Sequence, residues 1–272
     1  CGESRTGRDD RLRICACAHL TQTRCVQRMC AEMRIKMKIL GVDSSGLAAS
    51  AAVLSGDTVV AEFTVNNKKT HSQTLLPMIK EVVDFSGIPL EELDAIAVAA
   101  GPGSFTGLRI GSSTVKGLGL VLDKPIIPVP TLEGLAYQLA ESDGFICPIM
   151  DARRNQVYTG VYEMREGQMV EVMDQCAMDI HDLLKELSQY PVKVHFLGDG
   201  VPVYEEIIRE EIVNEYSFAP AHMSRQRAAA VAALGALYYH QGRVETAAEH
   251  RPVYLRKSQA EREREERLHA AD

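Results

Sequence analysis

Residues 38–46 read KILGVDSSG, a short apolar run that ends in a carboxylate and continues into a serine- and glycine-containing turn. Residues 146–151 read ICPIMD and end in the same way. Short apolar runs bounded by turn residues are typical of buried β-strands. Because the two carboxylates, Asp43 and Asp151, lie 108 positions apart, the pattern suggests two copies of one structural unit.

The elements expected in each half follow the same order of three strands, a helix, a strand, a glycine loop and a helix. Alternating and continuous apolar patterns predict the strands, and apolar residues three to four positions apart predict the helices. In the first half, the expected strands cover 38–43, 49–54, 58–65, 93–99 and 126–129, and the helices 71–85, 108–122 and 131–140. In the second half, the expected strands cover 146–151, 157–163, 169–173 and 192–197, and the helices 180–187 and 203–213, with a final helix at 224–239 and a strand-like stretch at 252–257.

The glycine loops strengthen the match between the halves. Gly101 and Gly103 follow one predicted strand, and Gly198 and Gly200 follow its counterpart, both pairs at an offset of 97. We therefore expect an α/β fold of two duplicated βββαβα lobes that face each other across a cleft, as in actin, sugar kinases and Hsp70 ATPase domains (the ASKHA fold). The alternative is a chance match between two unrelated α/β units, because Asp and Gly are common where strands end.

The first 36 residues differ from the rest of the chain. They hold five of the seven cysteines and a net charge of +4, and they show no hydrophobic periodicity. We expect an extra N-terminal segment that is disordered or not native, with the functional protein starting near Met37. A metal or redox tail built on Cys15, Cys17 and His19 and a basic transit-type tail are the alternatives.

Residues 37–272 are acidic and carry a net charge of −11, which with the +4 of the first 36 residues gives the overall −7. We expect a first lobe at 37–140, a second lobe at 141–257 and a charged tail at 258–272. Phosphate contacts need Lys and Arg, so such a body is a poor independent binder of nucleic acid. No apolar run reaches the ~18 residues that span a bilayer. Cys147 and Cys176 are far apart, which is typical of a reduced, cytoplasmic protein.

Two turns are candidates for an anion or nucleotide site. In two-lobed ATPases, an Asp at the end of the first strand orients Mg²⁺ or water, and backbone N–H groups of the next turn bind phosphate. The candidates here are Asp43, Ser44 and Ser45, together with Gly101, Gly103 and Ser104 at the start of a helix. Neither the Walker A motif nor the dinucleotide fingerprint fits residues 101–111. A structural turn in which Asp43 bonds nearby amides is the alternative.

The helix expected at 108–122 is unusually rich in small residues. Gly107 and Gly111 lie four positions apart, and so do Ser113 and Gly117. Each glycine inside a helix costs about 1 kcal/mol relative to alanine. Small residues at this spacing let another helix approach closely. The pattern therefore indicates either a face for a partner helix or tight packing within this chain.

Catalytic and metal motifs are weak. A metal site on a helix needs His at positions i and i+4, but Leu75 stands four residues after His71. We therefore interpret His71 as a helix-start or interface residue. No Gly-x-Ser-x-Gly motif occurs. Asp151 and Arg153 could combine a carboxylate with a cation, although a salt bridge or a hydrogen-bonded turn is the simpler interpretation.

Four segments taken together closely resemble the TsaB family, the dimerisation subunits of the bacterial tRNA threonylcarbamoyladenosine machinery. They are ILGVDSS at 39–45, HSQTLLP at 71–77, AGPGSFTGLRIG at 100–111 and MDARR at 150–154. The third segment is highly specific, and the others fall in the right order. The resemblance extends from about Met37 to Lys257.

The resemblance implies a function. TsaB proteins are paralogues of the catalytic subunit TsaD, which holds a metal through a helix-borne His-x-x-x-His and transfers threonylcarbamoyl to N6 of adenosine 37 in tRNAs that read codons starting with A. Leu75 stands where the second His would be. The expectation is a non-catalytic subunit, not an enzyme, that binds and activates TsaD. A stand-alone ATP-binding phosphotransferase or peptidase of the same fold is the alternative.

The family pairs with TsaD through helices of the first lobe. The residues that this implies for the interface are His71, Leu75, Leu76, Gly107, Arg109, Gly111 and Gly117. The TsaE ATPase is the expected third protein, and tRNA is reached through the complex. We expect no cofactor of the chain's own, ATP or ADP at the complex interface, and a metal only on TsaD. Whether the chain alone is a monomer or a homodimer stays open.

Overall fold

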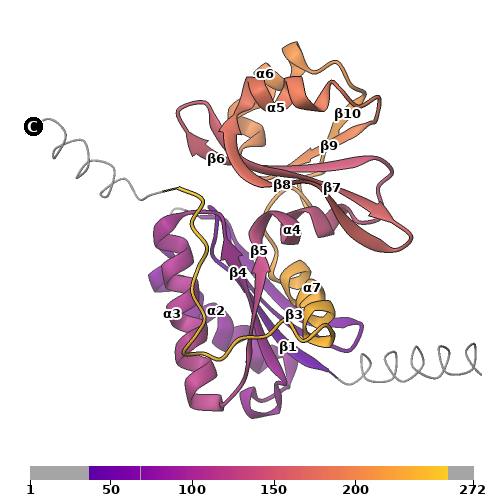
Figure 1. Cartoon of the computed structure of the whole chain (residues 1–272). Helices are drawn as coiled ribbons and strands as arrows, with labels where there is room; N and C mark the ends of the chain where they lie inside the picture. Colours follow the sequence, from indigo (N-terminus) through magenta and orange to yellow (C-terminus); the bar gives the residue numbers. More distant parts are fainter. Residues whose placement is uncertain (1–36, 68, 257–272) are drawn as a thin grey trace, which may run out of the picture.

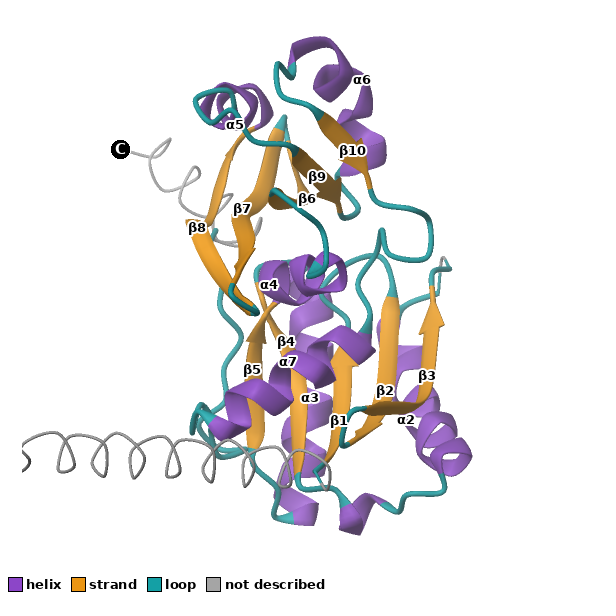
Figure 2. Cartoon of the chain, turned by 90° about the vertical axis from the view of Figure 1, so that its right-hand side faces the viewer, coloured by secondary structure: helices purple, strands orange, loops and turns teal. Residues whose placement is uncertain are grey.

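The computed structural model describes residues 37–67 and 69–256, which form two lobes, each around a five-stranded sheet (Figures 1 and 2). In the first lobe the strands lie in the order β3-β2-β1-β4-β5. β1 pairs antiparallel with β2 and parallel with β4, and β4 pairs parallel with β5. These strands are Lys38–Asp43, Ala49–Ser55, Thr58–Val65, Ala95–Gly101 and Ile126–Pro130.

The sheet of the second lobe has the same topology. Its strands lie in the order β8-β7-β6-β9-β10, with β6 antiparallel to β7 and parallel to β9, and β9 parallel to β10. They are Phe145–Arg153 (β6), Gln156–Arg165 (β7), Gln168–Asp179 (β8), Val194–Leu197 (β9) and Tyr216–Phe218 (β10). Two sheets with one strand order and one pattern of directions confirm the predicted duplication.

Helices cover both faces of the first sheet (Figure 2). α2 (His71–Ser86) and α3 (Phe105–Leu122) pack on one face, and α7 (Ala228–His240) packs on the other. Side chains of β1 alternate between these layers: Leu40 belongs to the core under α2 and α3, and Ile39 to the core under α7. The alternation buries both faces, as expected for a mixed sheet with helices on both sides.

The first lobe is built from two separate parts of the chain. A Cβ at Gly41 of β1 would lie 2.3 Å from the Ala228 oxygen, so glycine lets α7 lie directly on the sheet. α7 contacts β1, β2, β4 and β5. The sequence placed this helix in a second lobe at 141–257, but in the structure it belongs to the first lobe. Alanine-rich α7 is apolar on every side, and the first sheet buries it.

The second lobe carries α5 (Ile180–Leu187) and α6 (Val201–Glu211) over its sheet, with Leu183, Phe196 and Ile208 in their shared core. α4 (Thr131–Ala136) and the 3₁₀ turn Tyr137–Leu139 lie between the lobes (Figure 2). A separate core cluster there joins α4 to the second sheet; it includes Leu132, Leu135, Ile146, Met150 and Tyr162.

Several element boundaries differ from the sequence-based expectation. β1 and β3 begin and end as predicted, and so does α5. β8 runs on to Asp179, because it stays paired with β7 through two irregularities in register. β10 was not expected, since three residues are too short for a periodic pattern. Residues 252–256 form no strand, and Val253 alone among them donates a backbone hydrogen bond, to Ala100. The predictions for 1–36, Lys257 and 258–272 lie outside the described residues.

The segment after α7, residues 241–256, runs back along α3 toward the second lobe (Figure 1); we call it the strap. Lys116 Nζ of α3 donates to the Ala248 oxygen at 3.2 Å and to the His250 oxygen at 2.8 Å. Near the far end of the strap, Arg256 donates to the Ala152 oxygen in the second lobe at 2.8 Å. The strap thus links α3 of the first lobe with the second lobe.

Two further observations bear on the sequence-based expectations. Among the described residues, no helix has the length and apolar character needed to cross a membrane. The two cysteines outside the N-terminal segment are free thiols; Cys147 is buried and Cys176 is half-buried. Burial raises the pKa of the Cys147 thiol to about 12, so Cys147 behaves as a small core residue.

Candidate functional site

Asp43 lies buried at the end of β1, where the two lobes meet. Its Oδ1 accepts hydrogen bonds from the Ser45 backbone N–H at 2.9 Å and from the Ser45 hydroxyl at 2.6 Å. Burial raises the pKa of Asp43 to about 6, because removal from water disfavours the charged form, and the bonds from Ser45 and the nearby His71 offset part of this effect. The first turn is therefore an Asp-centred hydrogen-bonded turn.

The loop between β4 and α3 sits directly on this turn. The Ser104 N–H donates to the Ser45 oxygen at 2.7 Å. A Cβ at Gly103 would lie 2.4 Å from the same oxygen. The Ser104 hydroxyl caps α3 by accepting from the Gly107 N–H at 3.3 Å. The backbone N–H groups of Ser45 and Ser104, which a bound anion would use, are thus already bonded within the chain.

The structure therefore brings together five of the six residues predicted for the anion site: Asp43, Ser44, Ser45, Gly103 and Ser104. Gly101 turns elsewhere. It has a φ of 118°, and a Cβ there would lie 2.2 Å from the Val253 oxygen of the strap. Residues with a side chain rarely adopt a backbone φ of this value. Gly101 therefore packs against the strap and not against the turn at Asp43.

The second lobe contributes a matching turn. The Gly200 N–H donates to the Ile149 oxygen at 3.0 Å, and Asp199 accepts from the Asp151 N–H at 3.3 Å. Burial raises the pKa of Asp199, and its charge in turn raises that of Asp43. The glycine loop of the second lobe thus places the Asp199 carboxylate near Asp43, which lies at the end of β1.

Asp151 and Arg153 form a turn, which was the simpler of the two interpretations. The Arg153 N–H donates to Asp151 Oδ1 at 2.8 Å, and the Tyr204 hydroxyl donates to the same oxygen at 3.0 Å. His71 Nε2 lies 2.9 Å from the Gly46 oxygen, so this histidine ties the start of α2 to the β1–β2 turn. Among the described residues, no three His, Cys, Asp or Glu side chains are grouped so that they could hold a metal ion.

The two small-residue pairs of α3 face opposite ways. A Cβ at Gly107 would lie 2.1 Å from the Ser44 oxygen, and one at Gly111 would lie 2.4 Å from Ser44 Oγ. The Ser44 hydroxyl donates to the Gly107 oxygen at 2.9 Å. Gly107 and Gly111 therefore pack inside the chain, and their assignment to a partner interface is corrected: the β1–β2 turn already occupies that side of α3.

Ser113 and Gly117 point outward. Both are exposed, and a Cβ at Gly117 would meet no described atom within 4 Å. Leu75 belongs to the core at 1% exposure, so it too is corrected as an interface residue, whereas its neighbour Leu76 is 56% exposed. The helical period explains the difference, because adjacent residues lie about 100° apart around the axis.

The outward surface of these helices is apolar or small along much of its length. Leu120 and Val121 at the end of α3 are 65% and 85% exposed, and neither was among the predicted interface residues. Their spacing from Ser113 and Gly117 was the available signal, since positions 113, 117, 120 and 121 share one helix face. We define the α2–α3 face by Leu76 and Val83 of α2 and Ile110, Ser113, Gly117, Leu120 and Val121 of α3.

Arg109 lies beside this face. Its guanidinium carbon stacks 4.0 Å from the centre of the Phe105 ring, and Phe105 packs 4.6 Å from Tyr254 of the strap, centre to centre. A cation over an aromatic face is attracted by the ring. The exposed Arg109 therefore stands where α3 and the strap meet.

Comparison with known proteins agrees with this architecture. The family model described as "tRNA N6-adenosine threonylcarbamoyltransferase" (TsaD) matches residues 58–264. The Bacillus subtilis "tRNA threonylcarbamoyladenosine biosynthesis protein TsaB" is 36% identical over 199 residues, which are 73% of this chain and 87% of that protein. The chain belongs to the TsaB family.

A second TsaB protein, from Escherichia coli, is 32% identical over 181 residues, which cover 64% of this chain and 76% of that protein. Among solved structures, YeaZ from Pseudomonas aeruginosa superposes with a TM-score of 0.70 at 26% identity, covering 80% of this chain and all of that one. The two lobes described above are thus the α/β fold that this chain shares with YeaZ, and the resemblance to the TsaB family found in the sequence is confirmed.

Proposed function

We propose that this chain acts in tRNA threonylcarbamoyladenosine biosynthesis as a non-catalytic subunit that binds and activates TsaD, the transferase that modifies N6 of adenosine 37. Membership of the TsaB family supports the role in this biosynthesis. The observation that carries the binding proposal is the α2–α3 face, where exposed apolar side chains flank an open glycine.

The α2–α3 face leaves apolar side chains uncovered. Leu76, Leu120 and Val121 each leave most of their side chain in water, and burial of apolar surface yields roughly 25 cal/mol per Å². At Gly117 no described atom fills the place of a Cβ, so the backbone of another helix can approach closely there. A pair of helices from TsaD would cover both features and form a four-helix contact.

The second hypothesis is an enzyme in its own right, an ATP-binding phosphotransferase or a peptidase. It would need free backbone donors after Asp43. Instead, the Ser45 N–H is bonded to Asp43 and the Ser104 N–H to the Ser45 oxygen. This observation favours the subunit hypothesis. In the proposed complex, the TsaE ATPase is the third protein, ATP or ADP binds at the complex interface, and tRNA is held through the complex.

The experiment is a binding and transfer assay with the matching TsaD. Full-length chain, wild type or Gly117→Leu, is tested for pull-down of TsaD and for threonylcarbamoylation of tRNA by TsaD, TsaE and pre-made threonylcarbamoyl-adenylate. The matched control is Glu210→Leu, which adds the same side chain on exposed α6. We expect wild type and control to bind and activate, and Gly117→Leu to do neither.

Two outcomes would contradict the proposal. If Gly117→Leu binds TsaD as wild type does, the α2–α3 face is not the interface. If the wild-type chain fails to activate transfer but hydrolyses ATP or a peptide by itself, the enzyme hypothesis replaces the subunit hypothesis.

A further inference from the structure

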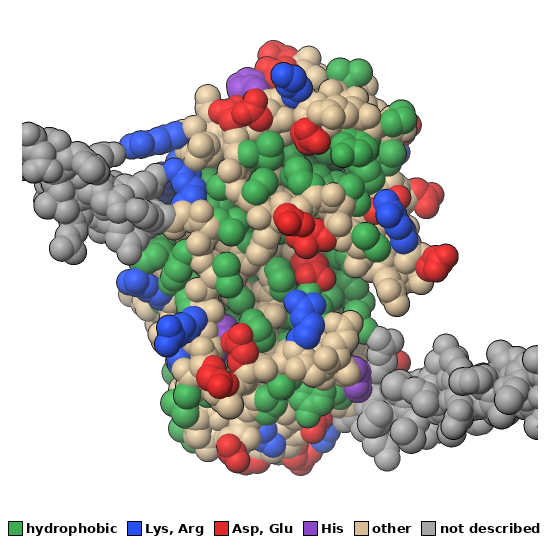
Figure 3. Space-filling view, viewed as in Figure 1, with side chains coloured by type: hydrophobic (Ala, Val, Ile, Leu, Met, Phe, Trp, Pro, Cys, Tyr) green, Lys and Arg blue, Asp and Glu red, His purple; other side chains and the backbone are tan. Residues whose placement is uncertain are grey.

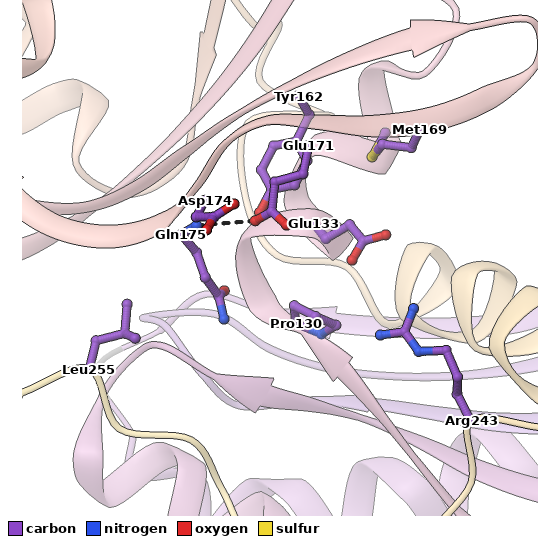
Figure 4. Close-up of a pocket in the computed structure, with 9 residues that line it drawn as sticks. All are labelled: Pro130, Glu133, Tyr162, Met169, Glu171, Asp174, Gln175, Arg243 and Leu255. Carbon is purple, nitrogen blue, oxygen red and sulfur yellow. Dashed lines mark hydrogen bonds between the residues drawn. The ribbon is translucent and has the colours of Figure 1, made fainter. Parts of the chain in front are cut away.

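A cavity of about 530 Å³ lies between the lobes, bordered by the end of β5, by α4, by β7 and β8, and by the strap (Figure 4). Acidic side chains gather on the surface where the lobes meet (Figure 3). The cavity is separate from the turn at Asp43 and from the α2–α3 face, since its lining shares no residue with either. Neither the family comparison nor the proposed function gives it a role.

The cavity lining is rich in negative charge. Glu133 from α4 and Glu171 and Asp174 from β8 line it, and Arg243 of the strap is the one basic residue among its lining residues. Burial raises the pKa of Glu133. The Tyr238 hydroxyl donates to Glu133, and the Arg243 guanidinium stacks 3.4 Å from the centre of the Tyr238 ring. Arg243 is thereby engaged with the wall of the cavity.

Two buried polar atoms of the lining are left without partners. Tyr162 is 2% exposed, and its hydroxyl has no hydrogen-bond partner among the described residues; the same holds for Gln175 Oε1. The Tyr162 side chain extends from β7 toward Glu171 (Figure 4). Burial raises the pKa of this hydroxyl, and the charges of Glu171 and Glu133 raise it further. Buried polar groups are nearly always bonded. The Gln175 oxygen and the Tyr162 hydroxyl oxygen can both accept a hydrogen bond, so the two atoms indicate a missing donor.

The remaining lining is apolar. Pro130, Met169 and Leu255 line the cavity between and beside the charged groups. In Figure 4, Asp174 and Glu133 lie on opposite sides with Glu171 between them. A single metal ion would need close ligands, and the described residues contain no such group. The arrangement instead fits an elongated ligand with a positive charge at each end and methylene groups between.

We propose that this cavity binds a small linear aliphatic diamine. The carboxylates and the Gln175 oxygen can only accept hydrogen bonds at neutral pH, and ammonium groups can only donate them. Three carboxylates and one guanidinium leave an excess of two negative charges, which a dication neutralises. Charge-assisted bonds of this kind are the stronger class, and the methylene chain contacts the three apolar side chains.

Calorimetric titration of the full chain with 1,4-diaminobutane tests the proposal. Butane-1,4-diol has the same carbon chain and no charge, and sodium chloride at equal ionic strength controls for screening. We expect one saturable binding event for the diamine and none for the diol or the salt. Heat from the diamine that matches the salt control would overturn the site.

Variants locate the binding. Glu171→Gln and Asp174→Asn should each weaken the diamine about tenfold, since a hydrogen bond to a charged group is lost. Tyr162→Phe should weaken it while leaving the melting temperature unchanged or raised, because its hydroxyl has no protein partner to lose. Glu210→Gln on α6 is the control and should bind as wild type. Equal affinity in all four variants would show binding to the acidic surface at large and overturn the proposal.

Discussion

Gly111 of α3 lies against Ser44 of the β1–β2 turn so closely that a Cβ at position 111 would stand 2.4 Å from Ser44 Oγ. Carbon and oxygen atoms do not approach to this distance without a shift of one of them. One side of α3 thus packs against the turn that follows Asp43, and the other side, with Gly117, is open. Substitution of Gly111 by leucine therefore tests folding, and substitution of Gly117 by leucine tests partner binding.

Gly111→Leu should destabilise the fold. Overpacking a tight contact typically costs about 1–3 kcal/mol, and here the clash is with the β1–β2 turn. A Cβ at Gly117 would meet no described atom within 4 Å, so Gly117→Leu should raise stability by up to about 0.8 kcal/mol, because leucine is the better helix former. Urea unfolding of both variants measures the difference; equal stabilities would contradict the opposite orientation of the two positions.

Gly117→Leu should also weaken TsaD binding by at least about tenfold, which corresponds to about 1.4 kcal/mol. The leucine side chain would stand between the two helix backbones in the proposed contact. Surface-immobilised TsaD and the purified variants give the dissociation constants. Gly117→Ala serves as the graded control, and its affinity should fall between those of wild type and Gly117→Leu.

Asp43 should make the fold less stable as the pH rises. Its folded pKa, about 6, lies above the ordinary value of 3.8, so the folded state binds the proton more tightly than the unfolded state does. The stabilisation that comes from protonated Asp43 is fully present below pH 4 and is lost as the pH rises through about 6. The full effect is about 3 kcal/mol at most, from 1.36 kcal/mol per pKa unit.

Asp43→Asn isolates this contribution, because the amide oxygen still accepts from Ser45 and carries no charge. The variant should be more stable than wild type at pH 8, by about 2 kcal/mol, and the gap should narrow toward pH 4. Urea unfolding across this range measures it. A gap that is constant with pH would show that the charge of Asp43 is not the cause.

Lys116→Met should loosen the strap. The ammonium loses two hydrogen bonds to strap carbonyls, each of which contributes on the order of 1 kcal/mol. Hydrogen exchange of the strap residues 248–256 should speed up. Lys80→Met is the matched control, because Lys80 pairs with Asp84 on the exposed side of α2, and exposed ion pairs contribute little to stability. Unchanged strap exchange in Lys116→Met would mean that other contacts hold the strap.

Local pattern predicted most of the fold. The apolar strand Lys38–Asp43 and the amphipathic helix Ile180–Leu187 begin and end where periodicity places them, because their partners reinforce the local preference. The strand β10 and the stretch 252–256 were missed or misassigned. Their conformation depends on a neighbour distant in sequence: β9 for Tyr216–Phe218, and the Ala100 carbonyl for Val253.

For the candidate site, too, local features were predictable from the sequence and contacts between distant segments were not. By itself, the sequence determined the duplicated order of elements, the two Asp-containing turns and the unusual glycine content of α3, since all of these are local or periodic properties. Only the tertiary structure decided that Gly111 faces Ser44 while Gly117 faces out, that α7 covers the first sheet, and that Glu133 and Glu171 share one cavity. Those facts depend on which surfaces meet when distant segments pack, and burial and close contact exist only after the chain has folded.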